Sequence, residues 1–182
     1  MARISMEALA IAIQKVRAMS MKDKEHLTDE VFAKQPNMLC SVLALSRMGV
    51  SIEKVDFLLE LLLLCFQAMK ESGLNWPLIT EQVQEAQLER QVAVMKFDQG
   101  LKPSLKHAAR EKYADSHPEH FLLAFVLNEI QDWRGRVNTE ESDTHIMLSA
   151  INLVNCLAWV ELPDSRKGAF GPHSNNVSHG QV

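Results

Sequence analysis

The chain has 182 residues, of which 47% are hydrophobic and 23% are charged, and its formal net charge is -4. This composition is typical of a globular protein with one well-buried core, so extensive intrinsic disorder is excluded. The mild negative charge argues against non-specific nucleic-acid binding, which needs a broad positive field.

Apolar residues recur with the period of an α-helix along most of the chain, and glycine and proline indicate where helices end and begin. The glycines that follow apolar-periodic runs are Gly49, Gly73, Gly100 and Gly135. The pattern predicts eight helices and no strands, with the helices at residues 3–20, 23–35, 36–48, 52–72, 77–99, 103–115, 118–134 and 140–160. We therefore expect an all-α, bundle-like single domain over residues 1–162, followed by a flexible polar tail at 163–182.

The fourth predicted helix, at 52–72, is apolar on nearly every side. Such a helix lies in the middle of a bundle or at an oligomer interface. Its candidate interface residues are Leu58, Leu61, Leu62 and Phe66. The sequence leaves open whether these side chains face the core or a partner.

The two halves of the chain match each other weakly at a shift of 81 residues. Residues 11–15, Ile-Ala-Ile-Gln-Lys, resemble residues 92–96, Val-Ala-Val-Met-Lys. The match predicts an internal duplication into two four-helix halves, 8–72 and 89–160, related by a pseudo-two-fold axis. A chance match is the alternative, because amphipathic helices share the same period.

The same shift aligns two His–Glu pairs, which are the sharpest candidates for a chemical site. In each pair the residues are four apart, so the imidazole and the carboxylate project from one helix face. If the pseudo-axis brings the two helices together, these groups suit zinc, iron or manganese, as in a metalloenzyme. The alternative is two exposed pairs worth about 0.2–0.5 kcal/mol each. The candidate metal ligands are His26, Glu30, His107 and Glu111.

A second group of polar residues surrounds the start of the seventh predicted helix. His117 and His120 flank this start, Asp115 and Glu119 are close enough to act as partners, and Glu129 belongs to the same group. These residues predict a site where the two imidazoles meet or, alternatively, helix capping and solvent exposure. No nucleophile motif accompanies either group, and a glycine-rich phosphate loop is absent from the sequence.

The three cysteines, Cys40, Cys65 and Cys156, lack the spacing of a zinc site, and their apolar surroundings predict buried free thiols. The first residues do not have the form of a signal peptide. The longest apolar stretch, 57–66, is interrupted by Glu60 and is much shorter than the ~20 residues of a membrane span. We therefore expect a cytoplasmic protein that does not enter a membrane.

No motif defines a reaction. The main hypothesis is therefore a non-catalytic helical protein that acts in protein–protein interaction or regulation, with a homodimer as the default oligomer. The alternative function is a metal-binding helical protein, and a third class is a bundle with an internal apolar ligand pocket. Nucleic acid is not an expected partner, because the basic residues of the sixth helix are best interpreted as a solvated face. These are Lys102, Lys106, Arg110 and Lys112.

Overall fold

The computed structural model describes residues 2–100 and 102–163, except for the side chains of 97–99, 103–104, 106–107 and 110. Within this part the chain is all-helical and has no strands, as the sequence predicts. The elements are α1 (Met6–Ala18), α2 (Met21–Lys34), α3 (Pro36–Ala44), the 3₁₀ helix η1 (Leu45–Met48), α4 (Ile52–Glu71), α5 (Glu81–Gln99), α6 (Pro103–Ser116), α7 (His120–Arg134) and α8 (Asp143–Trp159). None of the described helices is both long and apolar enough to cross a membrane. The predicted flexible tail lies outside the described residues from 164 onward.

Short polar residues, proline and glycine set several helix ends within two residues of the predicted bounds, as at α2, which is predicted to begin at residue 23 and begins at Met21. Ser20 and Asp23 form a reciprocal capping box at the start of α2, and Pro36 occupies the first turn of α3. Gly49 ends η1 with φ 83°, and Gly73 follows α4 with φ 67°. These left-handed conformations carry no steric cost for glycine.

The start of α5 departs from the predicted boundary. The sequence places a helix start near Pro77, whereas α5 begins at Glu81. A buried side chain from another helix explains the difference. The amide of Gln35 donates to Pro77 O (2.8 Å) and accepts from Ile79 N–H (2.9 Å). These two bonds hold residues 74–80 in a non-helical conformation.

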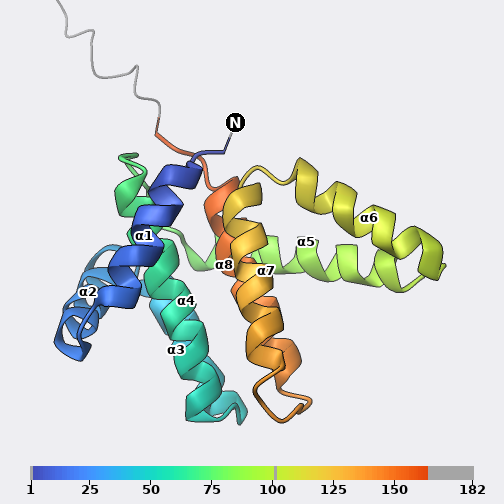
Figure 1. Cartoon of the computed structure of the whole chain (residues 1–182), viewed down its shortest axis with the longest axis horizontal. Coiled ribbons are helices and arrows are strands. Elements are labelled where there is room, and N and C mark those ends of the chain that lie inside the picture. Colours follow the sequence, from blue (N-terminus) through green and yellow to red (C-terminus); the bar gives the residue numbers. More distant parts are fainter. Residues whose placement is uncertain (1, 101, 164–182) are drawn as a thin grey trace, which may run out of the picture.

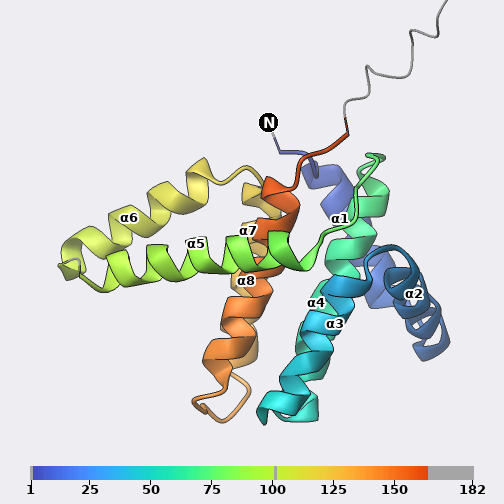
Figure 2. The ribbon, with the colours of Figure 1, turned by 180° about the vertical axis from the view of Figure 1, so that it is seen from behind.

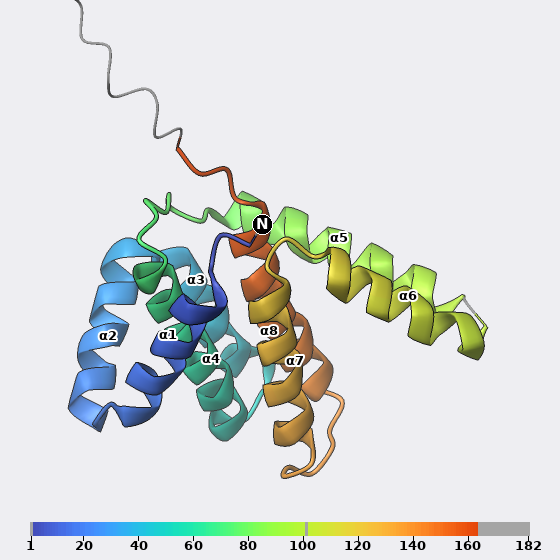
Figure 3. The ribbon, with the colours of Figure 1, turned by 45° about the horizontal axis from the view of Figure 1, so that its top comes forward.

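Helix α4 is the centre of the fold, with α1, α3 and α8 packed against it (Figures 1 and 3). The four candidate interface residues of α4 have exposed fractions of 0–3%; they are Leu58, Leu61, Leu62 and Phe66. They contribute to the core of this chain, together with apolar residues of α1, α3, α7 and α8. In this structure they are therefore core residues.

Helices α4, α7 and α8 join the two halves of the chain. Phe57 of α4 stacks on Trp133 of α7, with ring centroids 4.8 Å apart. At the start of α4, the buried Lys54 forms ion pairs with Asp143 of α8 and with Glu140, the latter at 2.8 Å. The hydrogen bond to Asp143 raises the pKa of Lys54 above its ordinary value. Because removing one partner would leave a buried charge uncompensated, this cluster fixes how α4 and α8 align.

Helices α5 and α6 extend away from the other helices as an arm, defined here as residues 81–116 (Figures 1 and 2). The first part of α5 packs across α8, and its second part leaves the bundle. Apolar side chains remain exposed along the arm, including Val94 (40%), Met95 (39%) and Leu105 (53%).

Two of the three cysteines are buried, as predicted. Burial raises the pKa of the Cys65 and Cys156 thiols to about 12, which leaves both unreactive at neutral pH. Cys40 is exposed, so the prediction was wrong at this position. The reason is that α3 turns Met38, Leu39 and Val42 inward and presents Cys40 on its outer side, beside a groove.

Candidate functional site

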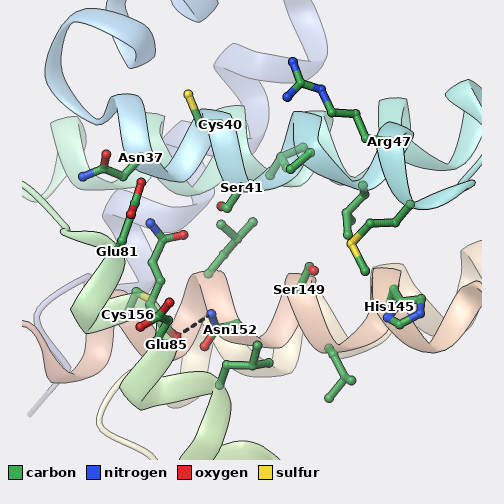
Figure 4. A pocket seen from close by; sticks show the side chains of 18 residues that line it. Asn37, Cys40, Ser41, Arg47, Glu81, Glu85, His145, Ser149, Asn152 and Cys156 are labelled. Carbon is green, nitrogen blue, oxygen red and sulfur yellow. Dashed lines mark hydrogen bonds between the residues drawn. The ribbon is translucent and has the colours of Figure 1, made fainter.

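An open groove of about 530 Å³ lies between α3 and α8, and the start of α5 closes one end of it (Figure 4). The two helices run in opposite directions along the groove. Asn37 of α3 lies at the same end as Asn152 of α8, whereas Arg47 lies at the same end as His145. The groove is therefore built from three segments that are distant in the sequence.

Helical spacing explains why these side chains line the groove. In α3 and η1, Asn37, Ser41, Ala44 and Met48 recur every three or four residues and occupy one side of the helix, next to its buried face. In α8, His145, Ser149 and Asn152 follow the same spacing. The hydroxyl of Ser41 donates to Met38 O of its own helix (2.8 Å). Small residues at the centre leave room there, because no large side chain fills it.

The base of the groove is apolar. Val42, Leu45 and Leu153 are buried there, and Leu148 is half-buried. At its two ends, the exposed apolar side chains are Met48 (60%) and Leu88 (38%). A bound group would therefore meet apolar surface along the middle of its length.

Acidic side chains lie at one end of the groove, and a basic side chain lies at the rim of the other end. Glu81 and Glu85 of α5 lie at the first end (Figure 4). Arg47 and His145 lie at the second end, where the Arg47 side chain extends from the outer side of α3, away from α8. All four residues are exposed, and none of them forms an ion pair or hydrogen bond through its side chain within the described part of the chain. Because α3 and η1 advance about 1.5–2 Å per residue, the lining from Asn37 to Met48 spans about 17 Å, or about three helical turns.

Side-chain amides join α5 to α8 beside the groove. Asn152 Nδ2 donates to Gln84 O (3.1 Å), and Asn155 Nδ2 donates to Gln91 Oε1 (3.4 Å). Two buried amide oxygens in the described part of the chain, Asn152 Oδ1 and Gln87 Oε1, have no hydrogen-bond partner. An unpaired buried acceptor costs about 1–3 kcal/mol. The contact between α5 and α8 is therefore incompletely satisfied.

A buried polar network lies where the arm meets the bundle. Glu119 N–H donates to His117 Nδ1 (3.1 Å), so the proton of the neutral imidazole is assigned to Nε2, which donates to Asn155 Oδ1 (3.1 Å). The Tyr113 hydroxyl reaches the same oxygen at 3.5 Å. Burial lowers the pKa of His117. The network thus holds His117 neutral and connects α6, α7 and α8.

The carboxylate of Glu119 extends this network to the first residues of the chain. It is fully buried and accepts the backbone N–H groups of Arg3 (2.9 Å) and Ile4 (3.1 Å). Burial raises the pKa of Glu119. The Arg3 guanidinium donates to Leu157 O (3.1 Å) and Val160 O (2.6 Å) at the end of α8. Since His117 is 4% exposed and Glu119 is 0% exposed, we interpret the network as a structural clasp and not as a reaction centre.

The structure does not bring the two His–Glu pairs together. Helices α2 and α6 lie at opposite ends of the molecule (Figures 1 and 3). His26 is exposed, and Glu30 forms ion pairs with Lys34 (2.8 Å) and Lys70 (2.5 Å), whose hydrogen bonds lower its pKa. Glu111 is exposed, and the side chain of His107 lies outside the described residues. Among the described residues, no group of three or more His, Cys, Asp and Glu side chains could hold a metal ion.

The second polar group of the sequence separates into different environments. His117 and Glu119 enter the buried network, whereas Glu129 forms an ion pair with Arg17 of α1 (2.8 Å). Asp115 is exposed and His120 is half-buried. Sequence reasoning identified these residues, but it did not identify the groove. The weak signal for the groove was the recurrence of small and polar residues along one side of α3 and α8, which solvated helix faces share.

Comparison of the chain with protein families, curated proteins and solved structures finds no match. The geometry and the charge of the groove are therefore the features that bear on function. The buried network contributes by fixing the position of α8, which forms one wall of that groove.

Proposed function

We propose that the protein is a non-catalytic interaction protein that binds an α-helix of a partner protein in the groove between α3 and α8. The observation that carries this proposal is the groove itself. It has an apolar base, a length of about three helical turns and unpaired opposite charges at its ends. Grooves of this kind bind the apolar face of an amphipathic helix through side chains spaced three or four residues apart.

The open form of the groove supports a helix over a small molecule. Small-molecule sites enclose 70–90% of a drug-sized ligand, typically in clefts or cavities. This groove is open to solvent between α3 and α8, and exposed residues such as Ser41 and Ala44 form its rim. A helix of about 10–12 Å diameter can lie there with one face buried and the other in water.

We also propose that the halves 8–72 and 89–160 derive from an internal duplication. In support, α1 packs on α4 as α5 packs on α8, and α3 packs on α4 as α7 packs on α8. Under this correspondence α1 covers the pair α4 and α7, whereas α5 covers the related pair α8 and α3 at one end. The groove is then the part of α8 and α3 that α5 leaves uncovered. The corresponding part of α4 and α7 is covered by α1.

The proposal is tested by blocking the groove. A phage library of helical peptides is selected against the protein, and the dissociation constants of the selected peptides are measured. Ala44→Trp places a large ring in the groove, and Leu43→Trp places the same ring on the adjacent exposed position of α3, outside the lining. We expect Ala44→Trp to weaken binding at least tenfold and Leu43→Trp to change it less than twofold.

Two outcomes contradict the proposal. Selected peptides whose affinity is the same for both variants bind elsewhere on the molecule. A stable dimer in solution that Ala44→Trp dissociates, measured by light scattering, assigns the groove to a second copy of the chain. Circular dichroism of both variants checks that the helical fold is retained.

A further inference from the structure

Resting on the proposed function, we infer that the partner helix binds in one direction, with its N-terminal end at Glu81 and Glu85 and its C-terminal end at Arg47. It then runs parallel to α3 and antiparallel to α8. The partner segment is an amphipathic helix with a basic residue in its first turn and an acidic residue in its last turn.

The charge at each end of the groove favours one direction of the bound helix. A helix carries a partial positive charge at its N-terminus and a partial negative charge at its C-terminus. Glu81 and Glu85 favour the positive end of a bound helix, and Arg47, at the rim of the opposite end, favours the negative end. The ends are about 17 Å apart, which exceeds the Debye length of about 8 Å at physiological ionic strength, so each end selects its own charge.

The charged side chains at the two ends of the groove have no ion-pair partners within the described chain. The acidic residues of α2 and α4 that form ion pairs, such as Glu30 and Glu71, are neutralised by lysines of the same chain. Glu81, Glu85 and Arg47 form no ion pair in the part of the chain that the structure describes. They therefore remain available to a bound helix.

The small residues at the centre of the groove indicate which apolar side chains the partner carries. Ser41, Ala44 and Ser149 are small, so the groove accepts large side chains from the partner at its centre. Leu or Met at positions i, i+4 and i+7 of the partner would reach the apolar base near Leu148 and Leu153. The partner is thus a helix with large apolar residues on one face and opposite charges at its two ends.

Cys40 allows the direction to be measured. Its exposed thiol lies at the outer rim of the groove, where it points away from α8, near the end that carries Glu81, whereas Cys65 and Cys156 are buried. Two 14-residue peptides share the same apolar face, the same first-turn lysines and the same last-turn glutamates. One carries an activated disulfide on a cysteine in its first turn, and the other carries it in its last turn.

We expect the first-turn peptide to react with Cys40 at least ten times faster than the last-turn peptide, with release of the coloured leaving thiol as readout. Cys40→Ser should abolish both reactions. Equal rates that disappear with Cys40→Ser show binding in both directions, which overturns the inference and leaves the proposed function standing. Rates equal to that of an unstructured control peptide show that the groove does not bind helices, which overturns both.

Charge reversal gives the second measurement, with peptides that lack the activated disulfide. Glu81→Lys with Glu85→Lys should weaken the lysine-first peptide about threefold to tenfold. The same double variant should favour a peptide whose first-turn lysines are replaced by glutamates. A glutamate-first peptide that binds the unchanged protein as tightly as the lysine-first peptide overturns the inference. Because first-turn lysines oppose the helix's own dipole, a preference for them comes from the groove.

Discussion

Helix α1 packs on α4 and helix α5 packs on α8, but different side chains hold the two helices in place. The buried residues of α1 are apolar and extend along the helix: Ala8, Leu9, Ala12 and Val16. Among the described residues of α5, the buried ones are Gln84 and Gln91. Helix α1 therefore stays on the bundle over its whole length, whereas α5 crosses α8 and leaves it (Figure 2).

The difference teaches that the two contacts have different strength and range. Burying a large apolar side chain contributes about 1.5–3 kcal/mol, whereas a hydrogen bond contributes about 0.5–1.5 kcal/mol net. Amide hydrogen bonds and the partly buried Val83 hold the first part of α5 on the bundle, and the groove between α3 and α8 remains uncovered beyond it. The groove therefore lies where α5 stops covering these helices.

The largest expected effect comes from the same substitution in both helices. Ala12→Asp places a carboxylate at a position of α1 that is 0% exposed, and we expect it to lower the free energy of unfolding by about 3 kcal/mol or more. Ala93→Asp changes the residue that the 81-residue shift aligns with Ala12, and Ala93 is exposed. It should change the free energy of unfolding by less than about 0.5 kcal/mol. Urea unfolding measures both, and equal losses would break the comparison.

An intermediate effect is expected where the arm joins the bundle. Burial lowers the pKa of His117 below its ordinary value of 6.5, so the folded state favours the neutral imidazole. As the pH falls below 6.5, the His117 imidazole is protonated in the unfolded chain before it is protonated in the folded one. The stability that neutral His117 contributes is therefore lost progressively until the pH reaches the lowered pKa of the folded state. We expect the stability difference between the unchanged protein and His117→Gln to shrink in this range, by at most about 1.4 kcal/mol per pH unit.

Glu119 contributes a pH dependence of stability of the opposite sign. The comparison with His117→Gln separates it from the contribution of His117. The pKa of Glu119 is raised, so the folded state binds a proton above the ordinary value of 4.5, and its contribution to stability decreases as the pH rises through that range. Because Glu119 is present in both proteins, its contribution largely cancels in their difference. If the difference in unfolding free energy between the unchanged protein and His117→Gln stays constant between pH 7.5 and 5, the pKa of His117 is not lowered in the folded protein.

The smallest expected effect sharpens the comparison by making α5 more similar to α1. Gln87→Leu removes a buried oxygen that has no hydrogen-bond partner, and we expect it to raise the free energy of unfolding by about 0.5–1 kcal/mol. The matched control is Gln91→Leu, which should lower it by about 1 kcal/mol because Asn155 Nδ2 loses its acceptor. Thermal unfolding of the two variants distinguishes them, and stabilisation by both would contradict the role given to the amides.

The sequence predicted the features that depend on helical periodicity. Apolar spacing with proline and glycine indicated the helices. The apolar surround of residues 52–72 indicated either a central helix or an oligomer interface, and the burial of α4 places its apolar residues in the core of the chain. The direction of α5 could not be predicted in this way, because Gln84 and Gln91 give no apolar signal although both are buried. The internal duplication and the dimer stay predictions.

The groove and the clasp escaped prediction for a related reason. A helical period indicates which side of a helix is apolar, but not which other helix that side meets. Ser41 and Ser149 are 108 residues apart and have no local pattern in common that would place them in one groove. His117 and Glu119 have the local pattern of a helix start, and their burial depends on contacts with Arg3, Ile4 and Asn155. Long-range contacts of this kind are set by tertiary packing.

The clasp also determines the order in which a growing chain can finish folding. Arg3 is bonded to residues that follow it by more than 100 positions, at Glu119, Leu157 and Val160. Helices α1 to α4 pack on one another and can assemble first during synthesis, but the clasp must wait for the end of α8. The wall of the groove that α8 supplies arrives at the same late stage. A partner helix that binds there would distinguish chains that have folded through α8 from shorter nascent ones.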